Sequence, residues 1–247
     1  MKNGRIYIGT SGWQYKHWRG AFYPEGLKIK DEFEYYCRYF DTVEVNNSFY
    51  RLPTKGIFEK WKKQAPEKFL YAVKGSRFLT HMKKLNGTRQ TFHKFFSHTG
   101  MLGDKLGPIL FQLPPRWKVN LERFSNFLKI LPPEYRYSFE FREHSWYNEE
   151  VYKLLKQYNC SFCIYELDRH LSPVLITADF IYLRLHGPGG KYQGSYKNTI
   201  LKNWSKQIMA WQKQGKDVFV DFDNDQEGYA VLNAIKLKEY CGLRMSN

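Results

Sequence analysis

The sequence lacks any long apolar segment. None of its apolar runs approaches the roughly 20 residues that a helix needs to cross a bilayer. The first residues, MKNGRIYIGTSGW, enter an expected strand at once and lack the apolar stretch of a signal peptide. We therefore expect a cytoplasmic protein with no membrane partner.

Cysteine is also scarce. Four cysteines in 247 residues do not make a disulfide framework. Cys160 and Cys163 form a C-x-x-C pattern, but they lie in an expected strand, where positions three apart point to opposite faces. No second pair of zinc ligands accompanies them in the sequence. We interpret both residues as small buried side chains.

Acidic residues are few beside the basic ones. The chain has 24 Asp and Glu against 39 Lys and Arg, which is a formal net charge of +15. Such a charge attracts nucleic acid, anionic membranes or phosphorylated substrates. A genome bias toward AT-rich codons, which encode Lys, Asn, Tyr and Phe, is an equally open explanation. The charge supports an anionic small molecule or a nucleic acid as partner without proving either.

No internal repeat or low-complexity linker divides the chain, and we expect one domain over residues 1–247. Its recurring pattern is a strand followed by a helix. Strands are expected at 5–12, 42–49, 69–76, 107–115, 136–143, 160–167, 180–187 and 216–225. Helices are expected at 28–40, 54–65, 88–99, 121–131, 148–158, 198–215 and 228–241. This order predicts an α/β fold, a (β/α)₈ TIM-like barrel that is irregular because the helix after the sixth strand is missing or short. An open doubly wound sheet could use the same order.

Polar residues gather toward the C-terminal ends of the expected strands, where barrel enzymes carry their chemistry. Three strands hold a pair two residues apart: Glu44 and Asn46, Glu140 and Arg142, Arg184 and His186. Residues two apart share one face of a strand, and the residue between each pair is apolar, which suits the helix-covered face. We therefore predict that these pairs face the barrel interior near its mouth.

The remaining strands add further polar groups, among them Glu166 on the sixth strand and Asp221 and Asp223 on the eighth. Counting Lys74, Arg142 and Arg184 against the two glutamates of the pairs gives three positive charges to two negative, which favours an anionic ligand. The structural alternative is a salt-bridge layer that closes the barrel top. The residues expected to bind substrate are Trp13, Asn46, Lys74, Gln112, Arg142, Arg184 and Asn224.

Two loops carry weaker signals. The stretch GTSGWQYKHWRGAFYP (9–24) interleaves aromatic and basic residues, either to face an anionic ligand and stack on bases or to cover the barrel mouth as apolar packing. The run GPGGKYQGSY after His186 places three glycines ahead of Lys191. It could cradle phosphate through its backbone N–H groups, act as a lid, or be a plain turn.

Motifs follow one another along nearly the whole chain: GTSGWQYKHWRGAFYP, TVEVNNSFYRLP, LYAVKGSRFLTH, LGPILFQLPPRW, FEFREHSWY, YLRLHG and FDNDQEGYAVLNA. In this order they resemble the YecE-like family, also catalogued as domain-of-unknown-function family 72. The resemblance implies a TIM-barrel-like fold and brings no established activity. The matching motif positions are Trp13, Glu44, Asn46, Lys74, His81, Gln112, Glu140, Arg142, His186 and Asn224. Asp221 and Asp223 stand near the place where the family pattern usually has a second asparagine or an aromatic residue.

We expect an enzyme, a hydrolase or another acid–base catalyst, that acts on an anionic, phosphate-containing substrate such as a nucleic acid. Glu44, Glu140 and His186 are the candidate catalytic residues, because nearby cations separate the pKa values of two carboxylates and imidazole transfers protons near neutral pH. The cofactor is unknown. A single Mg²⁺ or Mn²⁺ on carboxylates stays open, a multinuclear zinc site is not expected, and no metal ligand is assigned.

Two other functions stay open. A nucleic-acid-binding protein without chemistry would use the aromatic and basic side chains of the first loop. A carbohydrate-processing barrel would use paired carboxylates beside tryptophans, although the excess of positive charge disfavours a neutral sugar.

Overall fold

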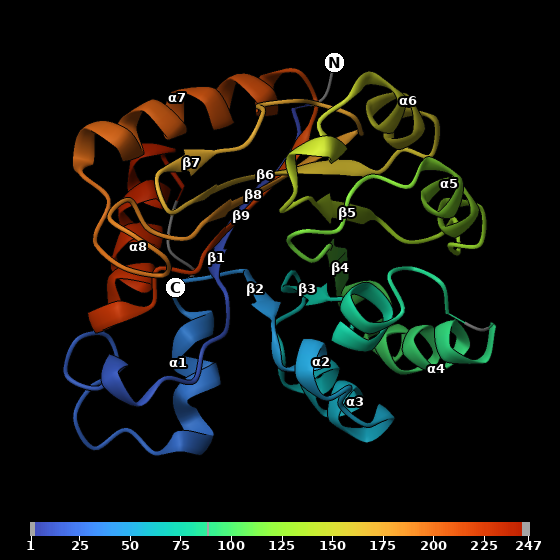
Figure 1. Ribbon diagram of the computed structural model, residues 1–247. Helices are drawn as coiled ribbons and strands as arrows, with labels where there is room; N and C mark the ends of the chain where they lie inside the picture. Colours follow the sequence, from blue (N-terminus) through green and yellow to red (C-terminus); the bar gives the residue numbers. More distant parts are fainter. Residues whose placement is uncertain (1–2, 88, 244–247) are drawn as a thin grey trace.

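The computed structural model describes residues 3–87 and 89–243. Eight parallel strands form a nearly closed barrel with helices around it (Figure 1). The parallel strands are β1 (Ile6–Thr10), β2 (Thr42–Val45), β3 (Leu70–Lys74), β4 (Leu106–Gln112), β5 (Tyr137–Glu140), β6 (Ser161–Leu167), β8 (Phe180–Leu185) and β9 (Asp217–Phe222). The predicted irregular (β/α)₈ TIM-like barrel is confirmed.

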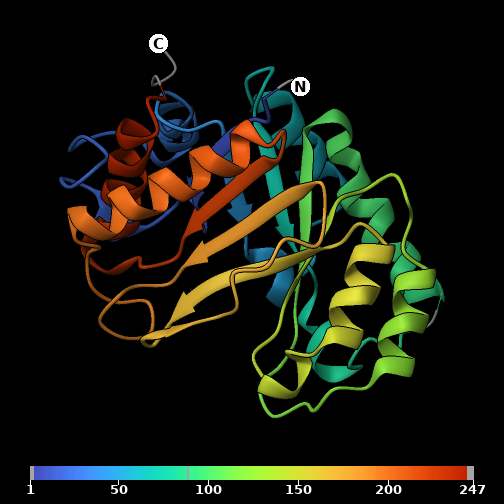
Figure 2. The ribbon, with the colours of Figure 1, turned by 90° about the horizontal axis from the view of Figure 1, so that it is seen from above.

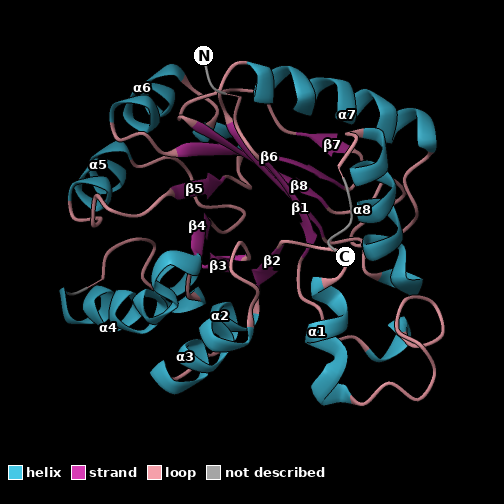
Figure 3. Ribbon diagram, turned by 180° about the vertical axis from the view of Figure 1, so that it is seen from behind, coloured by secondary structure: helices cyan, strands magenta, loops and turns pink. Residues whose placement is uncertain are grey.

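The helices pack outside the strands (Figure 3). They are α1 (Glu32–Cys37), α2 (Asn47–Tyr50), α3 (Lys55–Gln64), α4 (Arg89–Thr99), α5 (Leu121–Lys129), α6 (Glu149–Gln157), α7 (Asn198–Lys213) and α8 (Tyr229–Tyr240). In Figure 2, α7 and α8 (orange and red) lie on one side of the barrel, and α4, α5 and α6 (green to yellow) lie on the other. Single helical turns occur at Lys16–Trp18, Ile29–Asp31, Phe78–Met82, Gly100–Lys105, His144–Trp146 and Gln226–Gly228.

Hydrogen bonding runs through the sheet in the order β1, β9, β8, β6, β5, β4, β3, β2. At the two ends of this order, β1 and β2 meet through a single parallel bridge between Ser11 and Glu44. The barrel is therefore tied together at the C-terminal ends of its first two strands, beside the polar residues of the mouth.

Two connections depart from the simple alternation of one strand with one helix. The strand expected at 42–49 ends at Val45, because Asn46 takes a helical backbone conformation and α2 begins directly after it. The hydroxyl of Ser48 donates to the carbonyls of Val45 (3.1 Å) and Lys74 (2.7 Å), which ties this turn to β2 and β3. After β6 the chain forms a hairpin with β7 (His170–Leu171) in place of a helix, as the irregular connection predicted.

The barrel interior has two parts. Its lower part is apolar and holds Tyr7, Ala72, Leu110, Cys163, Tyr182 and Phe219. The rings of Tyr7 and Phe219 stack there with centroids 4.6 Å apart. Two residues further along several of these strands stand polar side chains, which form the upper part. The apolar part thus supports the polar layer at the mouth from below.

Two further expectations concern the sulfur residues and the membrane. Cys160 and Cys163 are buried free thiols, as interpreted from the strand pattern. Among the residues that the structure describes, no helix combines the length and the apolar character that crossing a membrane requires.

Candidate functional site

Arg184 lies at the centre of the barrel mouth, on β8, and is completely enclosed. Its guanidinium donates to Glu44 from β2 at 2.6 Å and to Glu140 from β5 at 2.7 Å. A third hydrogen bond, of 3.1 Å, joins it to Asp223 just beyond β9. One arginine therefore holds three carboxylates that come from separate parts of the chain.

A second arginine lies above the first. Arg142 follows β5 and forms an ion pair with Glu140 through Nε. Its guanidinium also covers the ring of Tyr165, 4.6 Å from the centroid, and donates to Nε2 of His186 at 3.1 Å. Arg142 is less enclosed than Arg184, so it forms part of the outer surface of the cluster.

His186 is completely buried beneath these groups. Its Nε2 faces the guanidinium groups of Arg142 (3.1 Å) and Arg184 (3.2 Å), which only donate hydrogen bonds. Nε2 therefore accepts, and the ring proton lies on Nδ1, which is 2.9 Å from Oδ2 of Asp223. The geometry selects one imidazole tautomer and fixes its orientation.

Glu44 has a partner on each carboxylate oxygen besides Arg184. Ser11 donates to Oε1 and Tyr182 donates to Oε2, both at 2.9 Å. Glu140 accepts from both arginines. Both glutamates are fully enclosed, so neither is open to a substrate in this arrangement.

Burial and the neighbouring charged groups together determine the pKa values of the buried acids. Burial opposes the ionised form of Glu140, yet the charges of Arg142 and Arg184 hold its pKa well below the usual range. The hydrogen bond from His186 and the charge of Arg184 likewise lower the pKa of Asp223 against its burial. Asp221 behaves oppositely. Burial first, and then the charge of Glu44, raise its pKa well above the usual value.

The predicted excess of positive charge in the cluster is wrong. Asp223 was not counted, but it binds Arg184 and His186 and is ionised. With it, the three carboxylates of Glu44, Glu140 and Asp223 equal in number the three cationic side chains counted from the sequence. This balance arises because β9 brings Asp223 to the same guanidinium that β2 and β5 reach.

Lys74, at the end of β3, differs from the two arginines. Within the described part of the chain, its Nζ has no hydrogen bond and no carboxylate within 4.0 Å. It lies instead over the ring of Phe49, 4.7 Å from the centroid. Burial, followed by the charge of Arg184, lowers the pKa of this amine.

His81 stands beside Lys74 in the π-helical turn Phe78–Met82, a rare backbone form that is frequent at functional sites. Its ring meets Phe49 edge to face at 5.0 Å, and Nδ1 is 2.9 Å from the Thr80 hydroxyl. Burial, and then the charges of Lys74, Arg77 and Arg142, lower the pKa of His81 to about 4. The β3 side of the mouth is therefore rich in cations.

The other predicted binding residues lie around this cluster. Gln112 pairs in register with Glu140 and is partly exposed. Trp13 packs against Phe33 and Trp61. Among the described residues, Nε1 of Trp13 and Oδ1 of Asn46 are both buried without a hydrogen-bond partner.

Asn224 lies outside the central cluster. It donates to the carbonyl of Gly194 (2.8 Å) and to Asn233 (2.9 Å), and so it supports the loop after β8.

Glu166 does not face the barrel interior. In the register between β6 and β8, Tyr165 pairs with Arg184, so Tyr165 points inward and Glu166 points outward. The hairpin after β6 leaves Glu166 on the outer face.

Sequence reasoning missed several members of the cluster. Tyr182 stands two residues before Arg184 on the same strand, so the two-residue spacing could have found it, whereas Asp223 was noted as polar but not assigned to the site. Tyr192 comes from the loop after β8, and its ring meets His186 edge to face at 5.5 Å. Nothing in the sequence marked Ser11, which reaches Glu44 only because the barrel closes.

Most aromatic side chains of the first loop pack inside the protein. Trp18 is 0% exposed, Tyr23 1% and Phe22 9%. Their rings pack on one another and on Tyr35, because the loop folds back onto α1. The apolar cover, the alternative interpretation, describes these side chains.

The glycine-rich loop after β8 uses some of its backbone N–H groups in hydrogen bonds within the protein. The N–H of Gly187 donates to the Tyr196 hydroxyl (3.0 Å), and that of Gly194 donates to Gln226 (3.2 Å). Gly187 has φ of +109°, and a Cβ there would lie 2.2 Å from the carbonyl oxygen of Gln193. The glycine serves the tight turn, and Lys191 lies toward Asp168.

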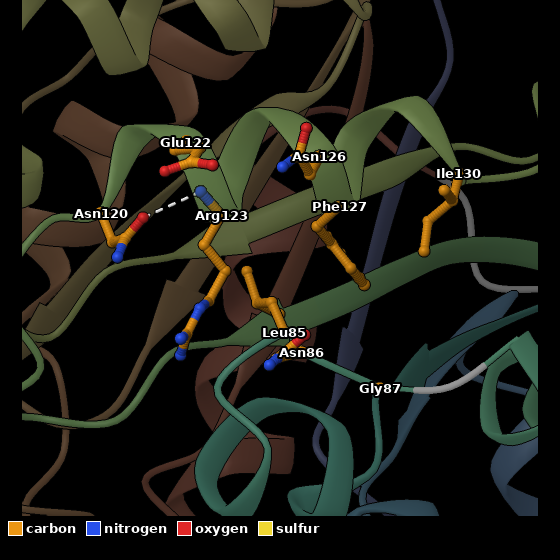
Figure 4. A pocket seen from close by; sticks show the side chains of 9 residues that line it. All are labelled: Leu85, Asn86, Gly87, Asn120, Glu122, Arg123, Asn126, Phe127 and Ile130. Atoms are coloured by element: carbon orange, nitrogen blue, oxygen red, sulfur yellow. Dashed lines mark hydrogen bonds between the residues drawn. The ribbon is translucent and has the colours of Figure 1, made fainter.

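Two other features bear on where a site could lie. Among residues 3–87 and 89–243, no group of three or more His, Cys, Asp or Glu side chains is arranged to hold a metal ion. A hollow of about 390 Å³ lies on the outer surface between residues 85–87 and α5 (Figure 4). It contains none of the predicted site residues, so the mouth is the better candidate.

The fold and the cluster define a TIM-like barrel protein with an arginine–carboxylate–histidine network at the C-terminal mouth. The family model described as "Protein of unknown function DUF72" matches residues 7–247, and the chain belongs to this family. The UPF0759 protein YunF of Bacillus subtilis is 27% identical, with 98% of this chain and 96% of YunF aligned. The UPF0759 protein YecE of Escherichia coli K12 is 27% identical over 58% of this chain and 50% of YecE.

Solved structures agree with the fold. A DUF72 family protein from Thermotoga maritima superposes with a TM-score of 0.84 and 26% identity, covering 95% of this chain and 98% of that one. A DUF72 family protein from Enterococcus faecalis gives a TM-score of 0.77 at 19% identity, covering 99% of this chain and 100% of the other, a likeness of fold.

Proposed function

We propose that this protein is an enzyme that binds an anionic, phosphate-containing substrate at the mouth of the barrel and carries out acid–base chemistry there. The observation that carries the proposal is the unbalanced β3 side of the mouth. The charges of Lys74 and Arg77 both lower the pKa of His81. Neither side chain forms an ion pair with a carboxylate in the described part of the chain. An anionic group of a substrate would supply the missing partner.

Binding would use groups on neighbouring strands. Lys74 ends β3 and Gln112 ends β4, while Arg142 follows β5. These three side chains are partly accessible, whereas Glu44, Glu140 and Arg184 are enclosed beneath them. In this proposal the outer groups hold the phosphate, and Arg184 with its three carboxylates keeps the strand ends at fixed positions.

Proton transfer is assigned to His186. Asp223 orients its imidazole and fixes the proton on Nδ1, so that Nε2 is the basic atom. Nε2 accepts from both Arg142 and Arg184, and a substrate anion that drew Arg142 toward itself would open one side of this atom while the Arg184 contact remained. Glu44 and Glu140 have both oxygens engaged, so in this proposal they stabilise positive charge rather than exchange protons.

Isothermal titration with inorganic phosphate, pyrophosphate and adenosine monophosphate tests the proposal. The variant Lys74→Met removes one charge-assisted contact and should weaken binding about tenfold. Lys206→Met, at an exposed position on α7, is the matched control and should bind like the parent chain. Absence of binding for all three anions, or equal affinity of the two variants, would contradict the proposal.

A second candidate is nucleic-acid binding without chemistry, favoured by an exposed apolar and basic rim. Tyr50, Met82 and Phe78 are 80%, 68% and 38% exposed on the connections that follow β2 and β3. Arg51 and Arg77 are exposed beside them in the chain. Flat side chains next to cations suit single-stranded nucleic acid. Binding of a labelled oligonucleotide should fall steeply with salt and weaken in Tyr50→Ala, and a flat salt dependence would exclude this candidate.

A further inference from the structure

We infer that the amine of Lys74 is a covalent nucleophile, which condenses with an aldehyde or ketone that carries a phosphate or carboxylate group and forms an imine. This inference rests on the proposed function, because anion binding at the mouth would bring such a carbonyl compound to the amine. It goes further by assigning a reaction to the site and a carbonyl group to the substrate.

The first observation is that Lys74 takes no part in the ion-pair network around it. Glu44, Glu140 and Asp223 all bind Arg184, and Glu140 also binds Arg142. A lysine that only neutralised the cluster would lie against one of these carboxylates. In the described structure Nζ lies over the ring of Phe49 instead, and no hydrogen bond or ion pair to a described residue engages its nitrogen.

The second observation is the surroundings of the amine. Only the unprotonated amine attacks a carbonyl carbon, and burial beside another cation is a known way to favour that form. Lys74 is largely buried, and Arg184 is the neighbouring cation that disfavours its protonation. The Phe49 ring favours the ammonium form. Burial, followed by the charge of Arg184, acts in the opposite direction and lowers the pKa of Lys74.

The third observation is a proton-transfer group nearby. His81 contacts the same phenyl ring at 5.0 Å, so Lys74 and His81 flank Phe49. With a pKa of about 4, His81 is a neutral imidazole at pH 7 and can accept and return a proton. Arg77 and Arg142 act on this same histidine and are placed to hold the anionic group of the substrate.

The reaction balances without a further reagent. The lone pair of Nζ forms a bond to the carbonyl carbon, and the C=O π electrons move to oxygen. His81 carries one proton from nitrogen to oxygen, which gives a carbinolamine. The second proton then moves from nitrogen to the hydroxyl oxygen. The C–O bond breaks, the oxygen leaves as water, and the C=N bond forms. Both protons of the free amine end in the water molecule.

Borohydride trapping tests this inference. The chain is incubated with glycolaldehyde phosphate or with its uncharged parent glycolaldehyde, reduced with sodium borohydride, digested and mapped by mass spectrometry. We expect Lys74 to be modified about tenfold faster than the exposed Lys206, with a half-maximal rate at lower pH and a preference for the phosphorylated aldehyde. Labelling of Lys74 no faster than Lys206 overturns the inference, and this comparison needs no variant.

The variant Lys74→Arg separates the inference from the proposed function, because it keeps the positive charge and removes the nucleophile. We expect it to retain inorganic phosphate binding and to lose the adduct at position 74. Phosphate binding in the parent chain without preferential labelling refutes the imine and leaves the proposed function standing. Absence of both phosphate binding and labelling refutes both.

Discussion

The ring of Tyr192 closes over His186, edge to face, with 5.5 Å between the two centroids. Tyr192 is itself 46% exposed, whereas His186 is fully enclosed, so this side chain from the loop after β8 forms part of the cover over the imidazole.

Removing this cover should expose the imidazole. In Tyr192→Ala we expect modification of His186 by diethyl pyrocarbonate to become several-fold faster, because the reagent attacks accessible neutral imidazole. Peptide mapping identifies the modified histidine. Tyr50→Ala is the control, since Tyr50 contacts Phe49 and is already exposed. Unchanged reactivity of His186 in Tyr192→Ala would show that other groups enclose it.

Arg184 should be essential to stability. Replacement by methionine leaves Glu44, Glu140 and Asp223 without their shared partner, and breaking a buried ion pair in this way costs about 3–5 kcal/mol. Urea unfolding measures the loss. The control Arg38→Met removes an exposed pair with Glu34 and should cost less than about 1 kcal/mol. Equal losses in the two variants would contradict the central role of Arg184.

Glu140 should stabilise the fold in a pH-dependent way. Its pKa is well below the usual value in the folded state, so its ionised form contributes stability above the unfolded pKa of about 4.3. This contribution is lost as the pH falls toward the folded pKa. Glu140→Gln should therefore be clearly less stable than the parent chain at pH 7, and the difference should shrink in acid. A difference independent of pH would refute this electrostatic origin.

Asp221 should show the opposite dependence. Its pKa is raised in the folded state, so stability falls as the pH rises above the unfolded pKa of about 3.9 toward the folded value. Asp221→Asn, which cannot ionise, should remove this loss. We expect the variant to gain stability relative to the parent chain between pH 4 and pH 7, measured by urea unfolding at several pH values. A relative loss over that range would show that Asp221 is ionised in the fold.

Local patterns predicted much of the architecture. The alternation of strands and helices, the hairpin-length gap after β6 and the two-residue spacing of the polar pairs all depend on residues close together in the chain. For this reason Glu140 and Arg184 could be assigned to the interior before any contact between them was known. Element ends were less predictable, as β2 shows, because Asn46 takes a helical conformation and the turn after it is held by the bond from Ser48 to the neighbouring strand β3.

The sequence alone determined the alternation of strands and helices and the ionisable side chains at the strand ends, because strand periodicity and order are local properties. Only the tertiary structure decided which charges meet. Glu44 and Arg184 are 140 positions apart, and their contact depends on the register and closure of the whole sheet. The same long-range geometry brought Asp223 into the network, turned Glu166 outward and left Lys74 without a carboxylate. Which charged side chains pair across a barrel depends on distances in space that no single stretch of sequence specifies.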